Sequence, residues 1–353
     1  MRIVIINKHV QDIVGGSEIQ TNIIANGLKN AGHSITYLAV NGRKDLYSAN
    51  YDVTPVKESS QEIYSITLAL FPDIVYWRSC RYVFPKFMKK FKKTGIPIVF
   101  AVSNKYDLVP TIAFNIYSKR IKSVKEFYHL VKQWYYIKKA DGVSVLNPDY
   151  IDLAPNKLKI AILNAMENNT KSFCWSKPYC VWVSNFHDTK RPELYVTLAK
   201  KLEYIGVDFL MIGRSSTNYK WIISGENLPE SFHYLGEKTV DEVNGILSLS
   251  LFHIHTCHPE GFGNVFIQAW LNKKPSISLG FDPGGFIEKQ KIGFNANNDF
   301  DLFVEKVKEY IENEELRKQA GQRAYDFAIH NFTPEALAEN VETFLLEVLE
   351  SKK

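Results

Sequence analysis

Residues 2–6 read Arg-Ile-Val-Ile-Ile, and this run decides how the rest of the sequence is interpreted. A continuous run of β-branched residues is typical of a strand that is buried on both faces of a parallel sheet. After a turn, Ser17 stands where a helix would be capped, and Gly32 stands where it would end. Apolar residues recur between them at helical spacing, at Ile19, Ile23, Ile24 and Leu28. With a second strand over 34–40, this segment predicts a βαβ unit.

The alternation of strand and helix continues beyond this unit. Further apolar runs predict strands at 74–77, 97–102 and 142–146. A helix that carries Phe87, Met88 and Phe91 precedes the second of these runs. Parallel strands with intervening helices build a doubly wound sheet, so we expect residues 1–165 to form a Rossmann-like α/β domain.

The pattern lapses and then restarts in the second half of the chain. The stretch 164–178 is polar and suited to a linker. Strands are then predicted at 179–183, 208–212, 232–235, 251–255 and 275–279, and helices at 192–205, 299–310 and 314–328. We therefore expect a second Rossmann-like domain over 175–330. A final amphipathic helix within 331–353, with Pro334 in its first turn, is expected to return toward the first domain.

The composition is that of an ordinary globular protein with 353 residues, 45% of them hydrophobic and 23% charged. The apolar N-terminal run is too short for a signal peptide, and no later stretch approaches the roughly 20 apolar residues of a membrane span, so we expect a cytoplasmic protein. The cysteines, Cys80, Cys174, Cys180 and Cys257, show no zinc-ligand spacing. We expect them to be buried thiols, and we expect no metal or other cofactor.

The net charge of +5 is too small to imply nucleic acid, but the charge is unevenly distributed. Between Lys119 and Lys139 lysines and one arginine are interleaved with aromatic residues, and Glu126 is the single acid. Two interpretations stay open for this stretch. It is either a solvated helix face whose aromatic residues fill the core, or a surface that docks on an anionic membrane.

A carboxylate and two glycines stand where a helix is expected to begin, in the segment 258–270, His-Pro-Glu-Gly-Phe-Gly-Asn-Val-Phe-Ile-Gln-Ala-Trp. Backbone N–H groups at a helix N-terminus bind phosphate well, and Gly261 and Gly263 leave them approachable. Glu260 would repel phosphate but would accept hydrogen bonds from sugar hydroxyls. The segment therefore predicts a site for a sugar attached to a phosphate.

This segment resembles the donor-binding motif of the family four retaining glycosyltransferases, in which two glutamates are separated by seven residues. The resemblance implies a GT-B fold, with two Rossmann-like doubly wound domains facing across a cleft. It also implies that Glu260 faces the donor sugar, and that Gln268 stands where a second glutamate accepts hydrogen bonds from the ribose. Gln268 keeps an acceptor oxygen without the charge, and the alternative is a residue on the helix surface. The resemblance adds that the amides of the helix terminus, at Gly261, Phe262, Gly263 and Asn264, hold the diphosphate.

A second resemblance lies in residues 182–194, where the family carries an arginine and then a lysine in a strand-to-helix turn. Here Asn185 occupies the arginine position and Lys190 the lysine position. An ammonium there would stabilise the charge that develops on the leaving phosphate, so Lys190 is the first catalytic candidate, with Glu260 beside it. Arg191 could equally be a solvated charge.

Three further positions resemble the donor site less specifically. Leu235 lies in a loop that meets the base through backbone groups, and Arg214 is a candidate substitute for the missing arginine. The pair Gly15 and Gly16 matches the family's glycine pair, whose amides close over the donor phosphate. A dehydrogenase is disfavoured, because the chain lacks the Gly-x-Gly-x-x-Gly pattern at this position.

On the acceptor side the family carries a His-Asp pair after the strand that corresponds to 97–102. This chain has no histidine there, and Asn104 and Asp107 are the nearest equivalents. The resemblance as a whole implies a retaining transferase that moves a sugar from a UDP- or GDP-sugar to a glycan or lipid-linked acceptor, in bacterial surface polysaccharide synthesis. The alternative is a nucleotide-sugar-binding regulatory protein with weakened catalysis, because three family positions are changed.

Overall fold

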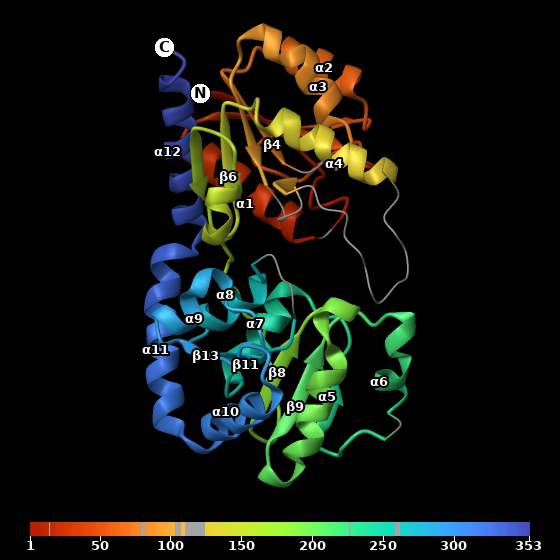
Figure 1. The fold of residues 1–353 in the computed structure, drawn as a ribbon, viewed down its shortest axis with the longest axis vertical. Helices are drawn as coiled ribbons and strands as arrows, with labels where there is room; N and C mark the ends of the chain where they lie inside the picture. The colour runs from red at the N-terminus through yellow and green to blue at the C-terminus, as the bar shows by residue number, and fades with distance from the viewer. Residues whose placement is uncertain (14, 79–81, 103–106, 110–123, 226, 258–261) are drawn as a thin grey trace. The chain divides into compact units, whose positions relative to one another are not determined.

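The computed structural model describes residues 1–353 except 14, 79–81, 103–106, 110–123, 226 and 258–261 (Figure 1). The chain divides into two compact units. Unit 1 consists of Met1–Ala165 together with Pro334–Lys353, and unit 2 consists of Met166–Thr333. The C-terminal helix α12 (Pro334–Glu350) therefore belongs to unit 1.

Unit 1 is built on a parallel sheet with the strand order β3-β2-β1-β4-β5-β6-β7. Its strands are β1 (Arg2–Asn7), β2 (Ser34–Val40), β3 (Asp52–Val56), β4 (Ile74–Arg78), β5 (Ile98–Ala101), β6 (Gly142–Val145) and β7 (Leu158–Ala161). Its other helices are α1 (Gly16–Asn30), α2 (Ser60–Ala69), α3 (Phe84–Phe91) and α4 (Val124–Ile137), with short 3-10 turns η1 (Lys92–Thr94) and η3 (Pro148–Leu153).

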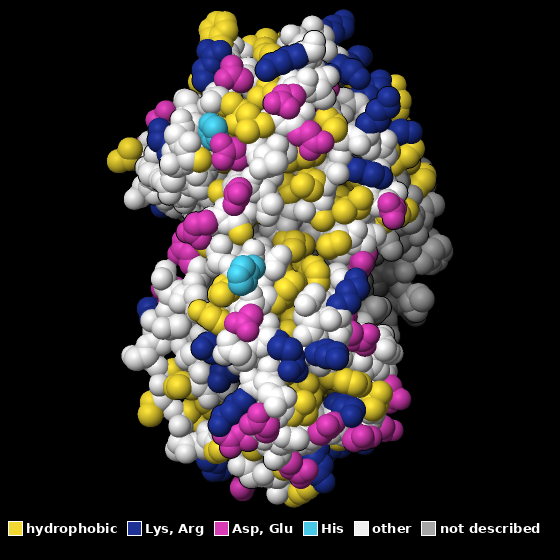
Figure 2. Space-filling view, turned by 90° about the vertical axis from the view of Figure 1, so that its left-hand side faces the viewer, with side chains coloured by type: hydrophobic (Ala, Val, Ile, Leu, Met, Phe, Trp, Pro, Cys, Tyr) yellow, Lys and Arg dark blue, Asp and Glu magenta, His cyan; other side chains and the backbone are white. Residues whose placement is uncertain are grey.

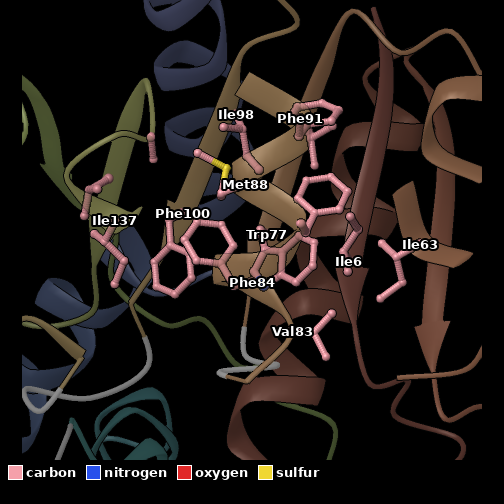
Figure 3. Close-up of a cluster of buried hydrophobic side chains, with 14 of the residues drawn as sticks. Ile6, Ile63, Trp77, Val83, Phe84, Met88, Phe91, Ile98, Phe100 and Ile137 are labelled. Carbon is pink, nitrogen blue, oxygen red and sulfur yellow. The ribbon is translucent and has the colours of Figure 1, made fainter. Parts of the chain in front are cut away.

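Helices cover both faces of this sheet because the central strands are apolar on both sides. One core cluster joins alternate strand residues to α2, α3 and α4, and Figure 3 shows Trp77, Phe84 and Phe100 packed within it. The other cluster joins the opposite strand face to α1 and α12. Gly27 of α1 allows this contact, since a Cβ there would lie 2.3 Å from Cβ of Ala338.

Unit 2 repeats the plan with a parallel sheet in the order β10-β9-β8-β11-β12-β13. Its strands are β8 (Tyr179–Val183), β9 (Asp208–Ile212), β10 (Phe232–Tyr234), β11 (His253–His255), β12 (Ser276–Ser278) and β13 (Gly293–Asn295). Its α-helices are α5 (Pro192–Lys201), α6 (Lys220–Ser224), α7 (Val240–Leu249), α8 (Asn264–Leu271), α9 (Phe286–Lys289), α10 (Phe300–Glu312) and α11 (Glu314–Asn331). Short 3-10 turns stand at η4 (Asp188–Lys190), η5 (Glu203–Ile205), η6 (Thr217–Tyr219) and η7 (Pro283–Gly285).

Three local predictions differ from the structure. Ser17 does not cap α1, because the N-cap is Gly15 and the hydroxyl of Ser17 accepts a hydrogen bond from Asn7 instead. The helix predicted over 192–205 ends at Lys201, where a 3-10 turn follows. Cys174 is exposed, whereas Cys180 and Cys257 are buried as expected and Cys80 lies outside the described residues.

Candidate functional site

The predicted donor residues that the structure describes in unit 2 lie at the carboxyl edge of its sheet. They stand in the loops that follow β8, β9, β10 and β11. Ligands of open α/β sheets bind where the strand order reverses, and in this sheet the reversal lies at β8, between β9 and β11. The sequence motifs are thus gathered at one edge of one sheet, although they lie far apart in the chain.

Lys190 ends the tight turn η4 and is half-buried. Its backbone N–H donates to the carbonyl of His187 over 2.7 Å. Its carbonyl accepts from Oγ1 of Thr256, also over 2.7 Å. The backbone of Lys190 is therefore held on both sides while its ammonium is carried by a side chain at the edge of the sheet.

Thr256 is a positioning residue that the sequence analysis missed. It follows β11, is fully buried, and its hydroxyl accepts a hydrogen bond of 2.9 Å from Nε1 of Trp182. The same hydroxyl donates to the carbonyl of Lys190. A hydrogen-bonded chain thus links the core of the sheet to the turn that carries Lys190.

Arg191 is not a solvated charge, as one interpretation of the sequence had it. Its Nε donates to the carbonyl of Thr256 over 2.5 Å, and its Nη1 donates to Oδ1 of Asn298 over 3.1 Å. The residue adopts a positive φ of 49°, which is uncommon for a residue with a side chain. Arg191 therefore ties the start of α5 to the loops after β11 and β13.

Two histidines of β11 are buried, and His255 lies close to these cations. Burial lowers the pKa of His255 far below its ordinary value, and the charges of His253, Lys190 and Arg191 lower it further. Burial likewise lowers the pKa of His253 to about 3. Both rings are therefore neutral at pH 7, and the positive charge at the end of β11 comes from Lys190 and Arg191.

Asn185 and Arg214 are in contact through the backbone. The N–H of Arg214 donates to Oδ1 of Asn185 over 3.1 Å, and the carbonyl of Arg214 accepts from the N–H of Phe186. The guanidinium of Arg214 is exposed. Asn185 thus uses its oxygen to join the two loops, and Arg214 brings a cation to the edge of the sheet.

Gly213 makes this loop contact possible. Its φ is 144°, and a Cβ on it would lie 1.8 Å from the carbonyl oxygen of Ser184. The neighbouring loop after β10 is joined to it, because the hydroxyl of Tyr234 donates to the carbonyl of Gly213 and the N–H of Gly213 donates to Gly236. Leu235 lies half-buried between these two contacts.

The helix α8 begins at the same edge. Its N-cap is Gly263, with a φ of 80°, and no side chain of the described residues caps it. Glu260 and Gly261 lie outside the described residues. Asn264 is the first residue of the helix and is half-buried. The ring of Phe262 is buried against Phe286 and Phe332 and is part of the core, and its predicted contribution to the site is its backbone N–H.

Gln268 is buried rather than on the helix surface, and it contacts a second amide. Its Nε2 donates to Oδ1 of Asn244 on α7 over 2.8 Å. Asn244 uses its own Nδ2 to bind the carbonyls of Glu167 and Asn169, over 3.2 and 2.8 Å. Because Asn244 spends its donors on the backbone, its oxygen needs a donor, which glutamine supplies and glutamate does not.

This contact predicts that the family residue is unfavourable in this chain. Gln268→Glu should lower the free energy of unfolding by about 1–3 kcal/mol, because a carboxylate would face the buried Oδ1 of Asn244. Urea unfolding followed by circular dichroism measures this. Gln322→Glu is the matched control, since Gln322 makes a similar contact to Asp326 on an exposed surface and should change stability by less than about 0.5 kcal/mol. Equal stability of Gln268→Glu and wild type would refute the explanation.

The structure describes three of the four predicted site residues of unit 1. Gly15 is the N-cap of α1 and Gly16 its exposed first residue. Asp107 is buried and accepts a hydrogen bond from Nε2 of Gln133 over 3.1 Å, so this carboxylate is directed at α4. Asn104 lies outside the described residues.

The second half of the chain is similar to known proteins. Residues 169–327 match the family model described as glycosyl transferases group 1. An uncharacterized glycosyltransferase of Methanocaldococcus jannaschii is 31% identical over 156 residues. This match covers 42% of the chain and spans 42% of that protein's length.

Solved structures share the whole fold at low sequence identity. The sucrose-phosphate synthase of Thermosynechococcus elongatus has a TM-score of 0.81 at 12% identity, and covers 99% of this chain and 100% of its own. The Anabaena protein HepE, in complex with UDP, has a TM-score of 0.72 at 13% identity, with 98% and 100% covered. The two Rossmann-like units therefore have the GT-B fold.

Proposed function

We propose that this chain, whose residues 169–327 match the family model described as glycosyl transferases group 1, transfers a sugar from a nucleotide-sugar donor to an acceptor. The observation that carries the proposal is the placement of Lys190, Arg214 and the N-terminus of α8 at one edge of the unit 2 sheet. Cationic side chains and free helix N–H groups are the donors that a diphosphate needs.

In the proposed reaction Lys190 binds the leaving diphosphate. Negative charge develops on the phosphate as the glycosidic bond breaks, and a preorganised ammonium stabilises that charge more than it stabilises the bound donor. The hydrogen bonds from Thr256 supply the preorganisation, because they fix the backbone of Lys190 before the donor arrives. Asn264 and its neighbours add N–H groups, and Gln268 has its Oε1 left for the ribose.

The nucleotide and the stereochemistry are also proposals. HepE binds UDP, and in a second structure UDP-glucose, so a uridine nucleotide is the first donor to try for this chain. The resemblance of residues 182–194 and 258–270 to retaining enzymes supports transfer with retention. A glycan or lipid-linked acceptor in surface polysaccharide synthesis fits the same resemblance.

Donor binding tests the proposal directly. A ligand that binds only the folded protein raises its apparent stability, by about 2.7 kcal/mol at a concentration of one hundred times Kd. Thermal unfolding is therefore recorded with UDP, GDP, UDP-glucose and GDP-mannose. Either the two uridine ligands or the two guanosine ligands should raise Tm, and the protein should slowly hydrolyse the nucleotide sugar of that pair. If no nucleotide changes Tm or gives heat in calorimetry, the proposal is wrong.

We further propose that unit 1 docks on an anionic membrane through a lysine–tyrosine face. This face is made of exposed or half-buried residues of α3, η1 and α4 with the two lysines that follow α4, namely Lys86, Lys89, Lys90, Lys92, Lys93, Tyr128, Lys132, Tyr135, Lys138 and Lys139. The helices α3 and α4 lie side by side (Figure 1). Residues 119–123 of the predicted stretch lie outside the described residues.

Two properties of the lysine–tyrosine face favour a lipid surface over simple solvation. Its tyrosines are exposed, at 60% for Tyr128 and 50% for Tyr135, although buried core positions are the usual place for such rings. Lys139 lies 4.0 Å from the ring centre of Tyr135, so charge and aromatic surface are presented together. By contrast, basic and acidic side chains are interspersed on the face shown in Figure 2. No helix among the described residues is long and apolar enough to cross a membrane.

Removing charge from the lysine–tyrosine face should weaken lipid binding. Each lysine near an anionic bilayer contributes about 1 kcal/mol, so the double variant Lys89→Gln with Lys93→Gln should bind about 30-fold more weakly. Both side chains are exposed. Co-sedimentation with phosphatidylglycerol vesicles measures this, and Lys200→Gln with Lys220→Gln in unit 2 is the control of equal charge. Equal binding by the two double variants, or no binding at low salt, would reject this docking surface.

A further inference from the structure

The carboxyl edge of the unit 1 sheet holds two buried polar side chains side by side. Strands β1 and β4 are neighbours with Ile6 opposite Trp77, so Asn7 and Arg78 end them in register. Both side chains point to the face covered by α1 and α12, because Ile5 and Tyr76, two residues earlier, lie in that core cluster. This is also where the strand order reverses in unit 1, the usual position of a ligand in such a sheet.

Arg78 is a buried cation, and no carboxylate among the described residues pairs with it. Only 2% of its surface is exposed, and its Nε has no hydrogen-bond partner. No ion pair joins it to an acid among the residues that the structure describes. A buried unpaired charge is costly, and an arginine retained in such a place is usually completed by an anion.

Asn7 presents an unused acceptor beside this cation. It is fully buried, and its Nδ2 donates to the hydroxyls of Ser17 and Thr21, over 3.3 and 3.0 Å. Its Oδ1 has no partner. The two strands therefore offer an unsatisfied donor and an unsatisfied acceptor within one strand spacing, yet the two atoms do not bind each other.

Small and polar residues stand beside Arg78 on the neighbouring strands. Its neighbours in register are the small residue Ala101 on β5 and, beyond it, Ser144 on β6. The hydroxyl of Tyr76 lies against Ser144 and Arg78. Burial raises the pKa of Tyr76, and the charge of Arg78 acts in the opposite direction, so this phenol stays neutral beside the guanidinium.

We propose that Arg78 and Asn7 form a subsite for an acidic sugar, with the proposed transfer reaction as the basis for calling this sugar the acceptor. Arg78 binds the anionic group, a phosphate or a carboxylate, through its guanidinium. Oδ1 of Asn7 accepts a hydrogen bond from a neighbouring hydroxyl of the sugar. Each of the two unsatisfied atoms then has a partner of the chemistry it lacks.

The stability of the full chain in the presence of small probes tests this subsite. The probes are inorganic phosphate, acetate, glucose 6-phosphate, glucuronate and glucose. Thermal unfolding is recorded at constant ionic strength, with chloride as the balancing anion. We expect saturable stabilisation by at least one of the acidic probes and none by glucose. The subsite binds a phosphate if phosphate and glucose 6-phosphate stabilise the protein more. It binds a carboxylate if acetate and glucuronate stabilise the protein more. If no acidic probe stabilises the wild type, the subsite does not exist.

Asn7→Asp is the sharpest variant, because it places a carboxylate beside Arg78 within the protein itself. It should weaken binding of the acidic probe at least tenfold, because the new carboxylate competes with the probe for the guanidinium. Arg78→Met, which removes the cation and keeps much of its volume, should also lose the binding. Unchanged probe binding by both variants would overturn the proposal.

A UDP titration of the wild type separates this inference from the proposed function. If UDP fails to bind while an acidic probe binds in a manner that depends on Arg78, the transferase proposal fails and the anion subsite stands. If UDP binds and no acidic probe does, the anion subsite fails and the transferase proposal stands.

Discussion

Lys190→Ala should lower kcat for sugar transfer by about 10²–10³-fold, the usual effect of removing one preorganised group that stabilises transition-state charge. Donor affinity should fall much less, because the ammonium is most effective once the leaving phosphate carries its full charge. The backbone hydrogen bonds that hold the turn should persist, since alanine keeps the N–H and the carbonyl of residue 190. Initial rates with saturating donor, together with calorimetric donor binding, measure both quantities.

Lys200→Ala is the control for this experiment. Lys200 is an exposed lysine near the end of α5, and its removal should change kcat by less than about twofold. A Lys190→Ala enzyme that keeps one third or more of wild-type activity would exclude the proposed role. Donor binding without measurable transfer by the wild type, unchanged by Lys190→Ala, would favour a regulatory binding protein instead.

Gly213→Ala should lower the free energy of unfolding by about 3–5 kcal/mol, which is large for a single methyl group. The positive φ disfavours any residue with a side chain, and the new Cβ would meet the carbonyl oxygen of Ser184 at 1.8 Å. Backbone atoms cannot turn aside as a flexible side chain would, so the loops after β8 and β9 must separate. The contact between Asn185 and Arg214 should be lost with them.

Gly206→Ala isolates the effect of the backbone angle alone. Gly206 also has a positive φ, 76°, but no atom lies within 4 Å of a Cβ placed on it. We expect a loss of about 1–2 kcal/mol from the angle. Urea unfolding of both variants measures the free energy of unfolding that each one loses. The difference between the two losses is the cost of the close approach to Ser184, and equal losses would show that the loops move apart without cost.

Most of the strands that the sequence predicted lie in the middle of the sheets, where both faces are buried, and β10 is a predicted strand that stands at an edge. The strands it missed, β3, β7 and β13, stand at sheet edges. β3 contains Pro55, β7 is only half-buried, and β13 begins with Gly293. Edge strands need fewer apolar residues and tolerate proline and glycine, so their sequences carry little periodic signal.

For the candidate site, the sequence revealed the motif residues but not the residues that hold them. Lys190 and Gln268 were found because each lies in a recognisable segment of the chain. Thr256 and Asn244 are buried polar residues whose partners lie 66 and 24 residues away, so no spacing within the chain points to them. Nothing in the sequence indicated the buried guanidinium of Arg78, because its sequence neighbours are those of an ordinary strand.

The path of the chain also bears on how the protein can be dissected. Unit 2 is one uninterrupted segment inserted into unit 1, which it enters after Ala165 and leaves before Pro334. The N–H of Met166 donates to the carbonyl of Phe332 over 3.0 Å, so the insertion starts and closes at nearly the same point. Residues 166–333 therefore form a natural excision fragment. Its removal leaves two ends that a few residues of linker should rejoin, so each half of the molecule is open to separate expression.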